Sequence, residues 1–170
     1  PISPLGAGFS KVKEGEPVLI DIVHVHRGYV SDCTRVFHSG HLGDEWKERL
    51  DDMIEIGSIV RRSLARGEMC SSAWTAGKEA AEERGHGGNL MGISPEQASF
   101  LGHSVGLELD ETPVVAEGFD RPLEVGGTMA IEPKVIHEEG AMGIEDTWSR
   151  TAEGMECLTS GDRLPSLIQW

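Results

Sequence analysis

Four carboxylates in this sequence each lie within an otherwise apolar, strand-like stretch: Asp21, Asp32, Glu132 and Glu145. Ionised carboxylates are rarely buried unless a cation pairs with them or coordinates them. A group of acids in apolar surroundings is therefore typical of a metal site. Solvated strand residues are the less favoured interpretation.

The first two acids belong to a predicted β-hairpin. Residues Val18–Val25 and Tyr29–Phe37 are rich in the β-branched and aromatic residues that favour strands. A hairpin that turns at His26-Arg27 places Asp21 opposite Asp32 on one face, with their Cβ atoms about 5 Å apart. Because like charges at that distance repel, we expect a cation between them.

A second predicted hairpin repeats this arrangement. Residues Met129–Ile136 and Met142–Arg150 flank a polar turn at 137–140. Centring the hairpin on Glu138-Glu139 places Glu132 opposite Glu145. Two hairpins that each hold facing carboxylates predict a shared metal centre.

His103 adds an imidazole, expected at the start of a short strand, Val105–Leu109. Four carboxylates and one imidazole carry about four negative charges, which two divalent cations would neutralise. These donors suit Mn²⁺, Co²⁺, Fe²⁺ or Zn²⁺, and of these we expect Mn²⁺ or Co²⁺. Two such ions about 3.5–4 Å apart polarise a carbonyl group and activate a shared water, which is hydrolytic chemistry.

The composition limits the classes of partner. A chain of 170 residues suits one domain, and a formal charge of −14 argues against binding nucleic acid or anionic membranes. No apolar run approaches the roughly 20 residues that a membrane span needs. Three scattered cysteines, an odd number, favour reduced thiols and a cytoplasmic protein.

Two helices must support the predicted strands. The first ends at Arg66-Gly67, and the second runs from about Ser72 to Arg84; a last short strand is expected at Glu156–Leu158. The fold class is α+β, with helices covering one face of a curved antiparallel sheet. At helical spacing, the expected buried residues are Trp46, Leu50, Met53, Ile54, Gly57, Val60 and Leu64 in the first helix, and Ala73, Trp74, Gly77, Ala80 and Ala81 in the second.

Four stretches resemble the motifs of the pita-bread metallopeptidases: LIDIVHVHRGYVSDCTR, GHSVGLELDETP, MAIEPK and GIEDT. This family includes methionine aminopeptidase, prolidase, aminopeptidase P and the metal-free creatinase, and the chain looks most like the Xaa-Pro peptidases. The resemblance spans Val18 to about Thr159. It implies a pita-bread fold and a metal-dependent peptidase.

The resemblance also implies a role for each predicted ligand. Asp21 would chelate one metal, while Asp32 and Glu145 would bridge the pair. His103 and Glu132 would hold the second metal, and Glu132 would also shuttle the proton of the bridging water.

Two positions depart from the family pattern. Asp110 stands where these peptidases usually carry a second histidine that hydrogen-bonds the substrate, and Gly143 stands where prolidase-like members tend to carry an arginine. Glu111 matches an acid that follows the second histidine and could orient Asp110. The resemblance thus implies an intact metal centre with an altered substrate-binding environment.

Relative to the family, the chain is short. We expect residues 1–170 to form a single catalytic domain that is the C-terminal part of a longer protein and lacks the family's first helical layer. The missing layer would leave an apolar sheet face uncovered.

The function that these features favour is a dinuclear, metal-dependent hydrolase similar to Xaa-Pro aminopeptidases and dipeptidases. Its expected partner is a small peptide substrate, with a homodimer as one option. Two alternatives stay open: a non-catalytic relative that binds a peptide or another partner in the same cleft, and a non-peptide amide hydrolase.

Overall fold

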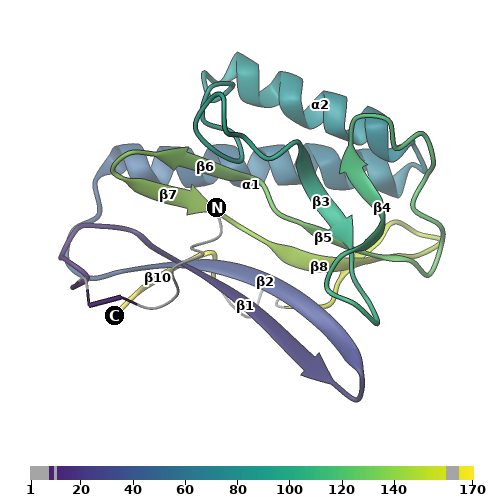
Figure 1. The fold of residues 1–170 in the computed structure, drawn as a ribbon, viewed down its shortest axis with the longest axis horizontal. Helices are drawn as coiled ribbons and strands as arrows, with labels where there is room; N and C mark the ends of the chain where they lie inside the picture. The colour runs from purple at the N-terminus through teal and green to yellow at the C-terminus, as the bar shows by residue number, and fades with distance from the viewer. Residues whose placement is uncertain (1–7, 10, 160–164) are drawn as a thin grey trace.

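The computed structural model describes residues 8–9, 11–159 and 165–170. Two helices lie side by side over one face of curved sheets, and a long hairpin extends below them (Figure 1). Neither helix in the described residues combines the length and the apolar character that crossing a membrane requires. The elements are β1 Val18–His26, β2 Tyr29–His38, α1 Asp44–Ala65, α2 Cys70–Glu83, β3 Phe100–Ser104, β4 Glu111–Ala116, β5 Thr128–Ile131, β6 Lys134–His137, β7 Gly140–Gly143, β8 Asp146–Arg150, β9 Met155–Cys157 and β10 Leu167–Gln169.

The described strands form three sheets whose neighbours are mostly antiparallel. Their orders are β1-β2-β10, β4-β3-β5-β8-β9 and β6-β7, and β10 runs parallel to β2. An isolated bridge between Thr34 and Glu145 joins β2 to the residues just before β8. This bridge brings the two acidic hairpins together.

The predicted register of the first hairpin is wrong by two residues. Asp32 pairs with Val23, and Asp21 pairs with Thr34. The turn lies at Arg27-Gly28, whose φ angles of 53° and 88° are those of the two-residue turns that match the twist of a hairpin. Because a shift of two residues preserves the alternation of a strand, the two acids still share one face.

The predicted register of the second hairpin is confirmed. Lys134 pairs with Gly143 in the β6–β7 ladder, and Ile131 pairs with Asp146 in the β5–β8 ladder. Each predicted strand is nevertheless divided in two, one of them at residues 132–133, where Pro133 has no N–H to donate. The division leaves Glu132 and Glu145 between the two ladders.

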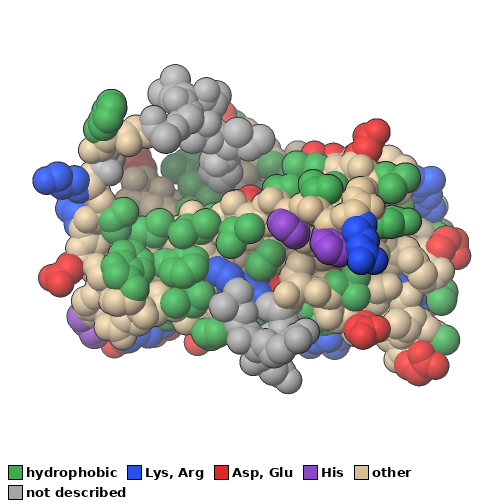
Figure 2. Space-filling view, turned by 90° about the horizontal axis from the view of Figure 1, so that it is seen from below, with side chains coloured by type: hydrophobic (Ala, Val, Ile, Leu, Met, Phe, Trp, Pro, Cys, Tyr) green, Lys and Arg blue, Asp and Glu red, His purple; other side chains and the backbone are tan. Residues whose placement is uncertain are grey.

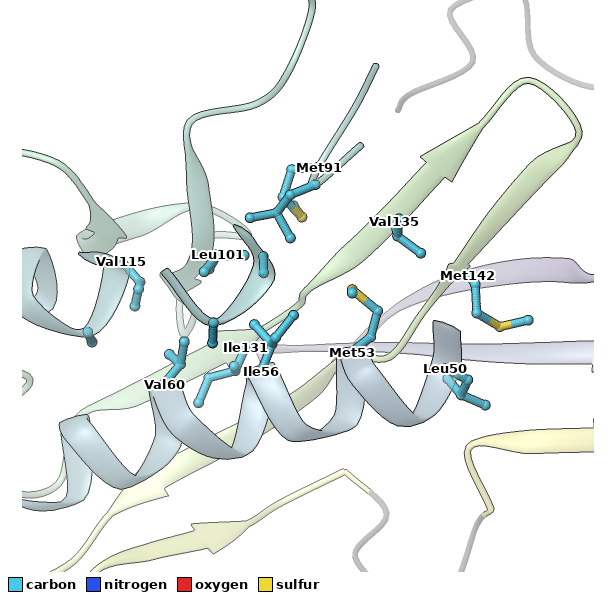
Figure 3. Close-up of a cluster of buried hydrophobic side chains, with 14 of the residues drawn as sticks. Leu50, Met53, Ile56, Val60, Met91, Leu101, Val115, Ile131, Val135 and Met142 are labelled. Carbon is cyan, nitrogen blue, oxygen red and sulfur yellow. The ribbon is translucent and has the colours of Figure 1, made fainter. Parts of the chain in front are cut away.

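The helices enclose the core, and Figure 3 shows side chains of α1 facing those of the sheet. Ile54 is 39% exposed, contrary to the prediction, while Ile56 is fully buried. Ile56 lies three residues after Met53 and four before Val60, which places it on the buried face of the helix. Ile54 lies outside this face. The helix ends are as predicted, since Gly67 and Gly85 follow them with φ angles of 77° and 78°.

The region around His103 differs from the prediction. His103 lies inside β3 rather than before a strand, and residues 105–110 are irregular. In that segment, the backbone N–H groups of Leu107 and Glu108 donate to the Glu111 carboxylate instead of to another strand. Strands β4 and β10 were not predicted, while β9 lies within one residue of its predicted position.

The hairpin strand β1 exposes apolar side chains on both of its faces. Ile20 and Ile22 are 40% and 45% exposed, and Val23 and Val25 are 49% and 58% exposed. Seen from below, hydrophobic side chains gather over much of the molecular surface (Figure 2).

Candidate metal centre

Three of the five predicted ligands meet in one buried group. Asp32 on β2, His103 on β3 and Glu145 before β8 each offer a donor atom, and these atoms lie within 4.8 Å of one another. Oxygen and imidazole donors at this spacing could hold a divalent metal ion.

Glu132 adjoins this group from the end of β5. Its Oε1 lies 3.2 Å from the Nε2 of His103, and its Oε2 accepts a 2.6 Å hydrogen bond from the Nζ of Lys134. The Nε2 of His103 also lies 3.9 Å from the Oδ2 of Asp32. Glu132 and His103 therefore present their donor atoms to the same small volume.

Asp21 lies at the edge of the group. Its side chain is 50% exposed, and its Oδ2 lies 3.6 Å from the Nζ of Lys134. Asp21 thus reaches the group beside Lys134 and also beside Asp32, whose pKa its charge raises. Lys134 was not predicted to belong to the site, although it follows Glu132 by two residues and strand alternation favours one shared face.

Two threonines hold the carboxylate-bearing strands in place. The Thr34 hydroxyl donates to Glu145 Oε2 over 2.7 Å. Thr147 Oγ1 accepts from the backbone N–H of Asp32 and donates to its carbonyl oxygen, over 3.0 and 2.9 Å. Because these contacts join residues more than 100 positions apart in the chain, no local sequence pattern indicates them.

A buried arginine fixes the segment that carries Glu145. Arg35 donates from Nη1 to the carbonyl oxygens of Thr34 and Glu145, and from Nη2 to the Asp146 carboxylate over 2.7 Å. Its side chain is 1% exposed. A guanidinium fork of this kind orients its acceptors rigidly, so Arg35 positions the Glu145 backbone against β2.

The imidazole of His103 is oriented for metal binding. Its Nδ1 lies 3.2 Å from the carbonyl oxygen of Ser104 and 3.6 Å from the Oδ1 of Asp110. When a carbonyl or carboxylate accepts from one ring nitrogen, the other is left as a ligand. The Nε2 that faces Asp32 and Glu132 is therefore the nitrogen that is left available to a metal.

Burial and crowding shift the pKa values of these acids. Burial, then the charge of Asp21, raises the pKa of Asp32 to about 6. Burial, then the charge of Glu132, raises the pKa of Glu145 to about 7. A bound cation would relieve both effects, because it favours the ionised form of each carboxyl group.

The pKa values of the other partners reflect their ion pairs. Burial lowers the pKa of His103, but contact with Glu132 outweighs it and raises the value to about 9. Burial likewise favours neutral Glu132, but hydrogen bonds from His103 and Lys134 bring its pKa below the usual value. The carboxylates of Glu132 and Glu145 raise the pKa of Lys134 despite its burial.

One buried oxygen shows that the group suits a cation. Within the described part of the chain, Asp32 Oδ1 is buried and has no hydrogen-bond partner. A buried acceptor without a donor costs free energy, and coordination to a metal would remove that cost. The residues therefore fit the divalent metal that their chemistry implies.

Comparison with known families supports this interpretation. The model of metallopeptidase family M24 matches residues 4–152. The chain belongs to metallopeptidase family M24. Members of this family are metallopeptidases, which use divalent metals.

Several M24 relatives are named as Xaa-Pro peptidases. The chain is 27% identical to the Xaa-Pro dipeptidase of Pyrococcus furiosus over 92% of this chain and 43% of that protein. It is 30% identical to the Xaa-Pro dipeptidase of Lactobacillus delbrueckii subsp. lactis over 91% of this chain and 40% of that protein. The chain therefore spans less than half the length of these relatives.

Solved M24 structures share the fold. The X-Pro aminopeptidase of Thermotoga maritima superposes with a TM-score of 0.86 at 26% identity, covering 98% of this chain and 46% of that one. The prolidase of Pyrococcus furiosus superposes with a TM-score of 0.81 at 28% identity, covering 94% and 46%. The predicted pita-bread fold is thus confirmed.

Asp110 was predicted to contact substrate, and Glu111 to orient Asp110. The side chain of Asp110 is 76% exposed, and its Oδ1 lies 3.6 Å from the Nδ1 of His103. The carboxylate of Glu111 accepts the backbone N–H groups of Leu107 and Glu108, over 2.7 and 2.9 Å. Glu111 therefore holds the loop that ends at Asp110.

Proposed function

We propose that this chain is the catalytic part of an Xaa-Pro peptidase that cleaves the N-terminal peptide bond of small peptides. The observation that carries the proposal is the meeting of Asp32, His103 and Glu145 around a buried, unpartnered oxygen. The names of the M24 relatives support the substrate class. A cytoplasmic location is proposed with it, because scattered, odd-numbered cysteines suit a reducing compartment.

Each residue of the centre has a role in this proposal. Asp32, His103 and Glu145 would hold the metal, which when bound would supply a Lewis acid and lower the pKa of a water. Glu132 Oε1 accepts the proton of that water and later passes it to the leaving amine. The exposed carboxylate of Asp110 accepts hydrogen bonds from the substrate's terminal ammonium.

The number and identity of the ions are part of the proposal. Mn²⁺ or Co²⁺ is favoured, because the donors are oxygens and one imidazole. A dinuclear centre requires Asp21 to hold the second ion, and Lys134 would then have to leave Asp21, Glu132 and Glu145.

Asp110 and Gly143 favour a second candidate, a non-peptide amide hydrolase. Both differ from the residues that the resemblance predicts. Both are expected to change the binding of substrate and to leave the binding of metal unchanged. An acyl amino acid lacks the terminal ammonium that Asp110 would recognise, so it separates the two candidates.

The experiment is a hydrolysis assay on the natural full-length protein, depleted of metal and then supplied with Mn²⁺ or Co²⁺. We expect release of the first amino acid from Xaa-Pro dipeptides and none from N-acyl amino acids. Turnover of the acyl substrates alone would favour the amide hydrolase. Peptide binding without turnover under every metal would instead identify a non-catalytic relative.

A further inference from the structure

The Nζ of Lys134 lies among three carboxylates that the resemblance assigns to metals. It is 2.6 Å from Glu132 Oε2, 2.8 Å from Glu145 Oε2 and 3.6 Å from Asp21 Oδ2. The Lys134 side chain is only 7% exposed. A buried ammonium with three acidic partners satisfies the requirement that buried charges be paired.

The backbone around Lys134 is built for this placement. Lys134 pairs with Gly143 in the β6–β7 ladder. A Cβ at position 143 would lie 2.7 Å from the Cγ of Lys134 and 2.8 Å from its Cα. Glycine at 143 therefore leaves room for the side chain of Lys134. Prolidase-like members tend to carry an arginine at this position, whereas here the positive charge comes from Lys134 on the paired strand.

The oxygens that remain define where a metal can bind. Glu145 Oε2 already accepts from Thr34 Oγ1 and from Lys134 Nζ. Asp32 Oδ1 is buried without a partner among the described residues, and His103 Nε2 faces the same group. The donor atoms that have no lysine partner thus belong to Asp32 and His103.

The charge balance of the site also favours one metal ion beside Lys134. The four carboxylates of Asp21, Asp32, Glu132 and Glu145 carry about four negative charges. The ammonium of Lys134 and one divalent ion together offset three of these charges. Two divalent ions beside the ammonium would leave the buried group with a net positive charge, and like charges at such short range repel strongly.

We propose that Lys134 supplies the second cation of this centre, so that the site binds one divalent ion, held by Asp32, His103 and Glu145. This inference rests on the proposed metal site. In place of the two metal ions that the sequence predicts, it assigns one metal ion and the ammonium of Lys134 to the centre. Asp21 then serves as a partner of Lys134 rather than as a ligand.

The test is the number of Mn²⁺ ions bound by the full-length protein after chelation and equilibrium dialysis, with the EPR spectrum as a second readout. We expect one ion per chain and the spectrum of an isolated Mn²⁺. Lys134→Ala should bind two ions and give the spectrum of a coupled pair. Lys134→Arg keeps the charge and should bind one, as should Lys47→Ala, which removes an exposed lysine paired with Asp44.

Each other outcome overturns the inference in an identifiable way. Two ions on the wild-type protein would show that Lys134 yields to metal, while leaving the proposed function intact. One ion on a folded Lys134→Ala variant would show that the lysine is not what excludes the second ion. No ion on the wild-type protein would overturn both this inference and the proposed function.

Discussion

The Nε2 of His103 lies 3.2 Å from the Oε1 of Glu132, and both side chains are more than nine-tenths buried. In the proposed mechanism, the Nε2 of His103 binds the metal and the Oε1 of Glu132 accepts the proton of the attacking water. Without an ion, the imidazole and the carboxylate are therefore partners of one another. A bound metal must replace this contact between His103 and Glu132. Mutation of either residue should therefore affect both metal binding and activity.

Glu132→Gln should lower kcat for Xaa-Pro dipeptides by about 10²–10⁴-fold, because the amide cannot accept the proton of the attacking water. The amide is close in shape to the carboxylate, so the circular dichroism spectrum should be unchanged. Steady-state kinetics on the metal-loaded, full-length protein measures the effect. The matched control is Glu138→Gln in the exposed 137–140 turn, which should leave kcat within error. Wild-type kcat in Glu132→Gln would exclude it as the base.

The stability of the chelated protein should fall with rising pH because of Asp32 and Glu145. Their folded pKa values, about 6 and about 7, lie above their ordinary values of 3.8 and 4.5. The folded state therefore binds these protons more tightly, and the stability they contribute is full below the ordinary values and lost as pH rises through the folded ones.

The melting temperature measures this loss against a variant. Between pH 4.5 and about pH 7, the wild type should lose stability relative to Glu145→Gln, which has no proton to release at this position. Glu138→Gln serves as the exposed control and should follow the wild type. Parallel curves for wild type and Glu145→Gln would contradict the predicted shift.

Asp110→Asn should mainly raise KM for substrates with a free amino terminus. The Asp110 carboxylate is largely exposed, so its pairing with an ammonium is screened by water and is worth up to about 1 kcal/mol, or about 5-fold in KM. Neighbouring Glu108→Gln provides the control. A large fall in kcat with unchanged KM would instead place Asp110 in the stabilisation of the transition state.

Glu111→Ala should loosen the loop between β3 and β4. Two backbone N–H groups, at Leu107 and Glu108, would lose their acceptor, at a cost of about 1 kcal/mol. Hydrogen exchange of these two amides should speed up, while the amides of α1 should be unaffected. Unchanged exchange at both loop amides would show that Glu111 does not hold the loop.

The strand faces could be predicted from the sequence better than the strand registers. Alternation alone placed Asp21 and Asp32 on one face, and the symmetric polar turn gave the pairing of Glu132 with Glu145 correctly. The first register was missed because the turn depends on the positive φ angles of Arg27 and Gly28, which residue type predicts only for the glycine.

The types of donor atom in the site could also be predicted, but the place of Lys134 among them could not. Strand alternation favours one face for Glu132 and Lys134, but Pro133 interrupts the strand between them, and a lysine side chain is ordinarily solvated. The buried position of Lys134 depends on the missing side chain at Gly143, on Glu132 two residues earlier, and on carboxylates from two other segments, Asp21 and Glu145. Such a contact exists only once the two hairpins are packed together.

Anomalous diffraction at the manganese edge, from crystals of the full-length protein grown with Mn²⁺, tests the metal centre most directly. The account predicts a peak at bonding distance from oxygens of Asp32 and Glu145 and from the Nε2 of His103. A map with no peak among these three residues, or with His103 turned away from the acids, would contradict it.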